Sequence, residues 1–192
     1  MIIALAIASF VLKGRHDLTI PSGGVSPDLV REMNSYYGIS EQTFLERFHI
    51  FYEKGTLIKK ERNIMEFDLK NVEEAGKQII EFSTKLIEHT GNPIIADIGV
   101  DRMVRLSGEE ALKQLAIAQD IVRQHRSLML WLVKPIMPWI IERLAPIADI
   151  HLKITREHGC ILLYGIKPRT PLYAIQLQPN KAPPIPDLIR IT

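Results

Sequence analysis

Hydrophobic and polar positions follow two different patterns of spacing along this chain. In segment 71–89 the apolar side chains recur at helical spacing, which predicts an amphipathic helix that ends at Gly91. These apolar positions are Val72, Ala75, Ile79, Phe82 and Leu86. Segments 93–98 and 128–133 are instead short, continuous apolar runs, which are typical of strands covered on both faces of a sheet. The chain therefore combines amphipathic helices with buried strands.

Caps and turn residues divide the rest of the chain into a regular alternation. Ser26, Ser40 and Ser107 each stand where a helix N-cap is expected, and Gly14 ends the first helix. We predict helices over 1–13, 26–37, 40–46, 71–89, 107–124 and 135–144, and strands over 16–20, 47–52, 93–98 and 128–133. Segment 54–69 has the character of a hairpin or loop. Alternating helices and strands are typical of an α/β fold with a mainly parallel sheet.

The pattern changes after Ala145, where strands follow one another with tight connections. We predict these strands over 150–155, 160–166 and 172–177. They should form an antiparallel C-terminal meander that extends an edge of the parallel sheet. From Pro179 the chain is rich in proline, which favours an extended segment on the surface. We therefore predict an α/β domain over 1–178 and a proline-rich extended tail over 179–192.

The composition is that of an ordinary globular protein. Of the 192 residues, 46% are hydrophobic and 24% are charged, and the formal net charge is +2. Such an even balance gives no electrostatic signal for a nucleic-acid partner. Cys160 is the single cysteine, so an internal disulfide and a cysteine-cluster zinc site are excluded. Because Cys160 begins an apolar run, we expect a buried side chain rather than a nucleophile.

Two apolar stretches resemble membrane segments in composition but not in length. Residues 1–12 lack the preceding positive charge of a signal peptide and are well short of the ~20 residues of a membrane span. Segment 128–141 is interrupted by Lys134, Pro135 and Pro138. We therefore expect a cytoplasmic protein without a membrane partner.

The strongest candidate for chemistry is Asp97, which follows the apolar residues 94–96 at the end of a predicted strand. In open α/β sheets, ligands bind beyond the carboxyl ends of the strands. A carboxylate in that place can organise Mg²⁺, which keeps several water ligands and needs only one or two carboxylates. The alternative is an aspartate that merely caps a helix or a turn.

Several segments together resemble the KaiC-like branch of the RecA superfamily, which includes KaiC-like regulators of the gas-vesicle type. Residues 94–97 resemble the Walker B strand, and helix 109–124 with strand 128–133 resembles the unit that follows it. Segments 147–152 and 165–169 resemble the next strand and the late hairpin that carries a Lys-x-Arg pair. The resemblance implies a RecA-like parallel sheet flanked by helices.

The same resemblance implies roles for four residues. Asp97 would be the catalytic and metal-binding aspartate of Walker B type, and Lys134 would be the polar sensor residue that contacts the cofactor. Lys167 and Arg169 would reach across a subunit boundary to a neighbour's γ-phosphate, where a cation offsets the charge of the transferring group. ATP and Mg²⁺ are thus the implied cofactors, and a homo-oligomer or another protein is the implied partner. The alternative for the Lys-x-Arg pair is two solvated cations in a turn.

The family's phosphate-binding loop, Gly-x-x-x-x-Gly-Lys-Ser/Thr, is absent from the 192 residues. Gly76-Lys77-Gln78 does not replace it, because these residues lie inside a predicted helix and Gln78 stands where a hydroxyl would hold magnesium. Segment 1–13 resembles the helix that normally follows the loop. Without the backbone cradle and its lysine, we expect no ATP turnover by these residues.

The sequence leaves three functions open. The first is a degenerate KaiC- or RecA-like nucleotide-binding-fold protein that acts through protein–protein contacts as a regulatory or assembly module. The second is an ATPase of the KaiC-like family whose phosphate loop lies upstream of Met1. The third is an unrelated α/β enzyme that acts on a small molecule. We favour the first, because the departure at the phosphate loop weighs more than the resemblance elsewhere.

Overall fold

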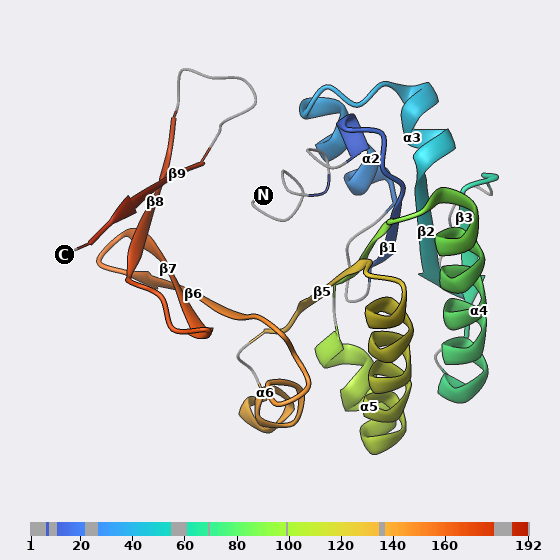
Figure 1. The fold of residues 1–192 in the computed structure, drawn as a ribbon. Coiled ribbons are helices and arrows are strands. Elements are labelled where there is room, and N and C mark those ends of the chain that lie inside the picture. The colour runs from blue at the N-terminus through green and yellow to red at the C-terminus, as the bar shows by residue number, and fades with distance from the viewer. Residues whose placement is uncertain are drawn as a thin grey trace. The chain divides into compact units, whose positions relative to one another are not determined.

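The computed structural model describes residues 7, 11–21, 27–54, 61–68, 70–98, 100–134, 137–178 and 186–191. Contacts within the chain divide it into two compact units, of which the first ends at Ile141 and the second begins at Glu142. The first unit is an α/β structure, and the second consists mostly of strands (Figure 1). The predicted domain over 1–178 therefore spans both units.

A five-stranded parallel sheet forms the centre of the first unit (Figure 1). Its strands are β1 (Asp17–Pro21), β2 (Phe48–Glu53), β3 (Ile64–Phe67), β4 (Ile94–Ile98) and β5 (Leu128–Leu132). Their order across the sheet is β3-β2-β1-β4-β5, and every neighbouring pair is parallel. The predicted α/β class with a mainly parallel sheet is confirmed. β4 and β5 are parallel neighbours as expected, although β5 lies at the edge of the described sheet and is only partly buried.

The helices of the first unit begin and end largely where their capping residues predict. They are α2 (Pro27–Tyr36), α3 (Glu41–Arg47), α4 (Val72–Thr90), α5 (Val100–Gln124) and α6 (Pro138–Leu144), the last of which reaches the division between the units. The Ser40 hydroxyl accepts the Thr43 amide at the start of α3, and Asn71 accepts the Glu74 amide at the start of α4. Gly91, with φ 86°, ends α4. None of the described helices is long and apolar enough to cross a membrane.

Helix α5 begins earlier than its capping pattern predicts. Helical turns start at Val100, whereas Ser107 was expected to be the cap. At Gly108 the backbone has φ 54° and ψ −130°, a conformation outside the helical region that a glycine adopts without a Cβ penalty. The sequence therefore predicted the segment after this break and missed the turns before it.

Segment 54–69 contains a strand that its sequence pattern does not reveal. β3 pairs in parallel with β2, with Ile64 opposite Ile50, at one edge of the sheet. The strand has only four residues, so an alternation of apolar and polar positions is too short to recognise. Glu66 within it adds polar character, which favoured a loop.

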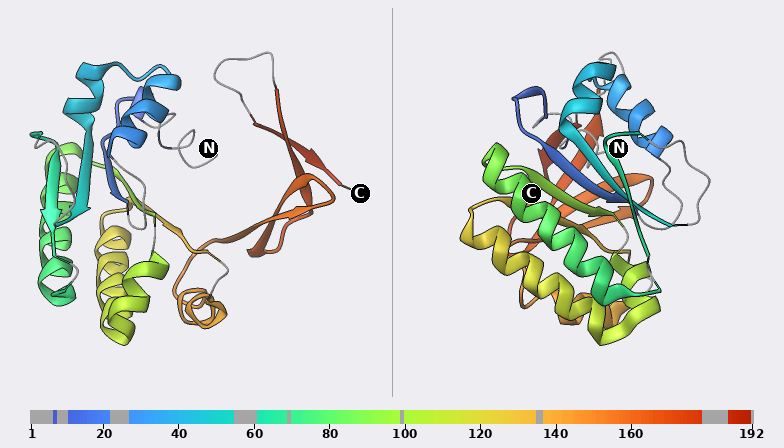
Figure 2. Two further views of the ribbon diagram at one scale, coloured as in Figure 1. Left: turned by 180° about the vertical axis from the view of Figure 1, so that it is seen from behind. Right: turned by 90° about the vertical axis from the view of Figure 1, so that its right-hand side faces the viewer.

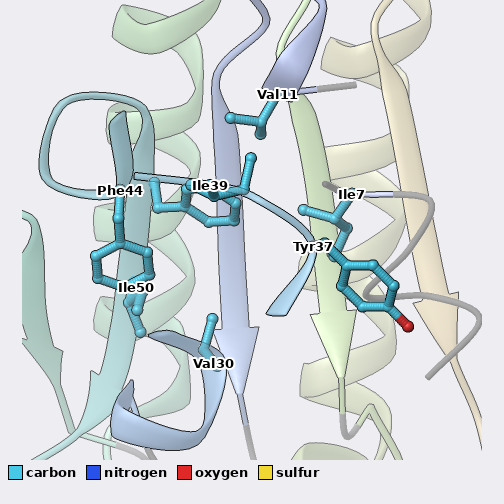
Figure 3. Close-up of a cluster of buried hydrophobic side chains, with 9 residues drawn as sticks. Ile7, Val11, Val30, Tyr37, Ile39, Phe44 and Ile50 are labelled. Carbon is cyan, nitrogen blue, oxygen red and sulfur yellow. The ribbon is translucent and has the colours of Figure 1, made fainter. Parts of the chain in front are cut away.

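Helices cover both faces of the five-stranded sheet. On one face α2 and α3 pack over β1 and β2 around a buried cluster (Figure 3). The cluster consists of Ile7, Val11, Val30, Tyr37, Ile39, Phe44, Phe48, Ile50 and Ala96. On the other face α4 and α5 lie side by side (Figure 2), and Phe82 of α4 packs against His49 and Phe51 of β2. Most of the predicted helix 1–13 lies outside the described residues, but Ile7, Val11 and Leu12 are helical.

Helices α4 and α5 approach each other closely at Gly76. A Cβ at this position would lie 2.5 Å from Oε1 of Gln114, a buried side chain of α5. A larger residue at this position would require the Gln114 side chain to move, so glycine favours the close contact between the two helices. Gly76 lies inside a helix, as the sequence predicts, and its role is packing rather than phosphate binding.

A four-stranded antiparallel sheet forms most of the second unit (Figure 1). Its strands, in spatial order, are β6 (His151–Glu157), β7 (Cys160–Lys167), β8 (Tyr173–Leu177) and β9 (Pro186–Arg190). The first three are strands as predicted, but they form a separate sheet instead of extending the parallel one. Residues 186–190 of the predicted tail pair with β8 as a fourth strand. Short connections pair consecutive strands with each other. The strands of the meander therefore form their hydrogen bonds with one another and not with the parallel sheet.

The prediction of a buried Cys160 is wrong, because its side chain is exposed. Cys160 is the first residue of β7 and pairs with Glu157 beside the turn at His158 and Gly159. The apolar run as a whole lies in a strand, but its first position lies beside the exposed turn of the β6–β7 hairpin. Burial therefore begins only further along the strand.

Candidate functional site

The carboxyl ends of the parallel strands lie along one edge of the five-stranded sheet. The chain runs outward from β1 through β2 to β3 and then returns to place β4 on the other side of β1. In open α/β sheets, ligands bind at such a reversal of strand order, beyond the carboxyl ends. Asp97, the fourth residue of β4, lies at this reversal, between Ile20 of β1 and Trp131 of β5.

Asp97 is a buried acid with a second acid beside it. Its exposed fraction is 4%. Burial, and secondarily the negative charge of Asp101, raise the pKa of Asp97 to about 7. Asp101 lies in the first turn of α5, and its Oδ1 is buried without a hydrogen-bond partner. Burial beside a second acid therefore favours the protonated form of the Asp97 carboxyl.

An ion pair ties the end of β2 to the start of α5. Arg102, in the first turn of α5, donates to Oε2 of Glu53, the last residue of β2, at 2.6 Å. Both side chains are about one third exposed, so water weakens the pair. No pattern in the sequence indicates this pair. Arg102 and Glu53 are 49 positions apart, and only the arrangement of the sheet brings them together.

The two acids match the number of carboxylates that Mg²⁺ takes from a protein. Asp97 and Asp101 would be the protein ligands, with water or phosphate supplying the remaining oxygens. Among the residues that the structure describes, no group of three or more His, Cys, Asp or Glu side chains is placed to bind a metal ion. The metal-binding role of Asp97 stays a prediction.

The three predicted cations have different surroundings. Lys134 is exposed, two residues beyond the end of β5. Lys167 belongs to the second unit, where its Nζ donates to the carbonyl oxygens of Ala148 at 2.6 Å and Pro146 at 3.3 Å. This ammonium group therefore holds the segment before β6 against the end of β7. Arg169, also in the second unit, is exposed and has no ionic partner among the described residues.

A tight turn holds Arg169 after the end of β7. The Gly165 amide donates to Oγ1 of Thr170 at 2.7 Å, and the Thr170 amide donates to the Gly165 carbonyl at 3.2 Å. A Cβ at Gly165 would lie 2.5 Å from the carbonyl oxygen of Pro168, so only glycine permits this close approach. Of the predicted Lys-x-Arg pair, Arg169 is the cation that is available to a partner.

A second titratable cluster lies at the amino edge of the five-stranded sheet. Nδ1 of His16 and Nε2 of His49 are 3.3 Å apart, their ring centroids are 5.6 Å apart and their planes differ by 9°. A centroid separation this much larger than the N···N distance places the rings edge to edge, as in an N–H···N hydrogen bond, and not face to face. Burial lowers the pKa of His49 to about 4, so the pair is neutral at pH 7.

The histidine pair shows no signal in the sequence, because the two residues are 33 positions apart. Parallel pairing of β1 with β2 places Leu18 opposite His49 and brings His16 to the same face. Phe82 of α4 covers the ring of His49 at a centroid distance of 5.3 Å. This packing accounts for the burial that keeps His49 neutral.

No protein-family model and no curated protein matches the sequence. Solved structures do match, among them two from Pyrococcus horikoshii. The uncharacterized protein PH0321, crystallised in complex with an unknown peptide, has a TM-score of 0.66 at 14% identity, covering 100% of this chain and 86% of that one. The KaiC-like protein PH0186 has a TM-score of 0.60 at 13% identity, covering 98% and 84%. The fold of this chain is KaiC-like.

The KaiC-like fold confirms the resemblance that residues 94–97 and 128–133 carry in the sequence. Their two strands are adjacent and parallel, and Asp97 lies near the carboxyl end of its strand. At such low identities the likeness establishes the fold alone. The roles of Asp97, Lys134, Lys167 and Arg169 stay predictions.

Proposed function

We propose that this chain is a protein-binding module built on a KaiC-like fold, with a regulatory or assembly role and without nucleotide turnover of its own. The observation that carries the proposal is the apolar surface of the second unit. Leu152, Ile154 and Leu188 are 56%, 48% and 55% exposed. Large apolar patches on soluble proteins usually mark sites of interaction.

The state of Asp97 supports the second half of the proposal. A carboxylate that organises Mg²⁺ must be ionised and in contact with the ion. Asp97 is instead buried, with an exposed fraction of 4%, which limits its contact with a hydrated ion. In addition, the 192 residues contain no phosphate-binding loop motif. Catalysis on ATP lacks its usual backbone cradle here.

The structural neighbour PH0321 supports the first half, because that protein was crystallised in complex with a peptide. A protein with a fold similar to that of this chain can thus hold a peptide. For the present chain we propose the same class of partner, a segment of polypeptide, with no commitment to the same surface.

Two measurements test the proposal. The purified chain with Mg²⁺ and ATP should release no phosphate above the buffer rate, and Asp97→Ala should behave identically. Turnover in the unmodified chain that is lost in Asp97→Ala would contradict the proposal. In the second measurement, a displayed library of random peptides is selected against the folded chain. A consensus motif should be enriched, and a library without enrichment would argue against a peptide partner.

A second candidate function is binding of Mg²⁺ and ATP, which the proximity of Asp97 and Asp101 at the strand-order reversal favours. In calorimetry, Mg²⁺–ATP would then bind the unmodified chain, and Asp101→Asn would weaken binding about tenfold or more, because one of two carboxylates is lost. Asp120→Asn, at an exposed position of α5, is the matched control and should bind normally. Equal binding by all three proteins would exclude this candidate.

A further inference from the structure

Both faces of the β6–β9 sheet carry apolar side chains, and the two faces differ in their charges. Cross-strand pairing places Ile154 opposite Leu163, Ile161 opposite Ile175, and Ile175 opposite Leu188. Residues opposite each other in an antiparallel sheet share one face. We call this the Leu152 face, and its aliphatic members are Leu152, Ile154, Ile161, Leu163, Ile175 and Leu188. These side chains cross all four strands, with Leu152, Ile154 and Leu188 exposed, Ile161 and Leu163 half-buried, and Ile175 buried.

The charges on the Leu152 face have a single sign. Arg156 shares the face because it pairs with Ile161, and Arg190 shares it because it pairs with Tyr173. The acids of these strands, Glu157 and Asp187, alternate onto the opposite face. Both arginines are exposed, and neither has an ionic partner among the described residues.

The two arginines lie on opposite sides of the apolar surface. Arg156 is on β6 and Arg190 is on β9, the two outer strands of the sheet. The aliphatic side chains of β7 and β8 lie between them. An elongated apolar ligand over these central strands would therefore have a guanidinium group along each flank. Arginine donates to carboxylates in a bidentate geometry, which suits it to this place.

We propose that the Leu152 face binds an amphipathic, acidic segment of a partner protein, with an apolar stripe against the sheet and carboxylates on both flanks. This inference rests on the proposed function as a protein-binding module. A helix is the form that fits, because a helix covers a sheet face with one apolar stripe and presents acids on either side of it. Arg156 and Arg190 set the sign of charge that the partner must carry.

The charges argue against a second copy of this chain as the occupant. Two identical Leu152 faces in contact would bring four arginines and no acid into one interface. Like charges that face each other across an interface oppose association. An acidic partner avoids this repulsion between arginines, and its carboxylates can form ion pairs with Arg156 and Arg190.

The probes for this proposal are two synthetic helical peptides of about 18 residues, which is about five turns. Both carry leucine at positions i, i+3, i+4 and i+7. One has glutamate at the flanking positions and the other has lysine. In fluorescence anisotropy the leucine–glutamate peptide should bind the chain and the leucine–lysine peptide should bind at least about tenfold more weakly. Affinity should fall as salt is raised, because the flanking pairs are exposed to water.

The variants separate the two faces of the sheet. The double variant Arg156→Glu with Arg190→Glu should bind the acidic peptide about tenfold or more weakly and should now bind the lysine peptide. The control is Lys153→Glu, which reverses one positive charge on the same strand as Arg156 but on the opposite face, and it is compared with the single variant Arg156→Glu as well as with the double variant. Its affinity should stay within about twofold of the unmodified chain, because its charge does not face the peptide. Circular dichroism and thermal melting establish that each variant is folded.

Four outcomes would overturn the proposal. The first is equal affinity for the two peptides, and the second is an equal effect of Lys153→Glu and of the arginine double variant. The third is tighter binding to vesicles of anionic lipid than to the acidic peptide, which would assign the face to membranes. The fourth is a dimer in sedimentation that Ile154→Glu dissociates, which would assign it to a second copy. ATP turnover by the chain would instead contradict the proposed function and would leave these peptide measurements unaffected.

Discussion

The two edges of the five-stranded sheet each hold a buried aspartate, and the pKa of both is raised to about 7. Asp17, at the amino edge, is fully buried, and its Oδ2 accepts the Thr19 hydroxyl of the same strand at 2.6 Å. Asp97, at the carboxyl edge, has the negative charge of Asp101 beside it. Burial is the largest cause of the raised pKa at both edges, the Thr19 hydrogen bond opposes it at Asp17, and the Asp101 charge adds to it at Asp97. The neighbours distinguish the edges, because a hydroxyl donor stabilises a carboxyl group in the core whereas a second acid attracts a cation or a proton.

The largest effect that we expect concerns the amino edge. The pKa of Asp17 is raised from 3.8 to about 7, so its stabilising contribution is complete below pH 3.8 and is lost as the pH rises through 7. Asp17→Asn removes this dependence and should stabilise the fold at pH 8 by roughly 2–4 kcal/mol, from about three units of pKa. Urea unfolding at pH 8 and at pH 4 measures the difference. The control Asp120→Asn, at an exposed site, should have no effect, and a gain in Asp17→Asn that is equal at both pH values would refute the assignment.

The next effect concerns His49, whose contribution to stability changes with pH in the opposite direction. The pKa of His49 is lowered from 6.5 to about 4, so its contribution is complete above pH 6.5 and is lost as the pH falls through 4. His49→Gln should flatten the loss of stability over this window by roughly 1–2 kcal/mol, a value reduced because the ring is partly exposed. His89→Gln is the control, because His89 lies exposed near the end of α4 and its replacement should leave the acid slope unchanged. An unchanged acid slope in His49→Gln would show that the histidine pair is not the cause.

The third prediction separates the two aspartates directly. Asp101→Asn removes the negative charge beside Asp97 and should lower the pKa of Asp97, while the pKa of Asp17 stays where it is. Carboxyl carbon chemical shifts followed by NMR through a pH titration report the two sites in one experiment. Equal movement of both pKa values would mean that the variant changes the whole sheet and not one edge.

The smallest effect concerns the ion pair between Glu53 and Arg102. Both groups are about one third exposed, so the coupling free energy should be roughly 0.5–1 kcal/mol and should decrease with salt. A double-mutant cycle with Glu53→Gln and Arg102→Gln isolates this coupling from the other contacts of each residue. A coupling of several kcal/mol would show that the pair is better shielded from water than its exposure indicates.

Much of the first unit could be predicted from local pattern. The apolar spacing of α4, with Asn71 and Gly91 at its ends, needs only the helical period and two caps. The run at 94–98 needs only an apolar, β-branched segment, and its end places Asp97 at the correct edge of the sheet. These features depend on neighbours in sequence, which is why the sequence indicates them.

The features that were missed depend on neighbours in space. His16 and His49 meet because β1 pairs with β2, and Glu53 meets Arg102 because α5 begins beside β2. Lys167 was expected to reach a neighbour's γ-phosphate or, alternatively, to be a solvated turn cation. Its ammonium group donates to two carbonyl groups about 20 residues earlier in the chain, which a sequence pattern does not encode. The one-sided charge of the Leu152 face follows from strand register, which is known only once the pairing is known.

The pairing of β1 with β4 has a consequence for how the sheet forms and opens. These strands are separated in the chain by β2, β3 and three helices, so their union closes a long loop and carries a large entropic cost. Asp17 and Asp97 lie at the two ends of this seam, opposite Ile94 and Ile20. As the pH rises above 7, both carboxyl groups become charged along the same line. The protection of backbone amides from hydrogen exchange should therefore be lost first along the β1–β4 seam. The pairing of β1 with β2 should persist after β4 has separated from β1.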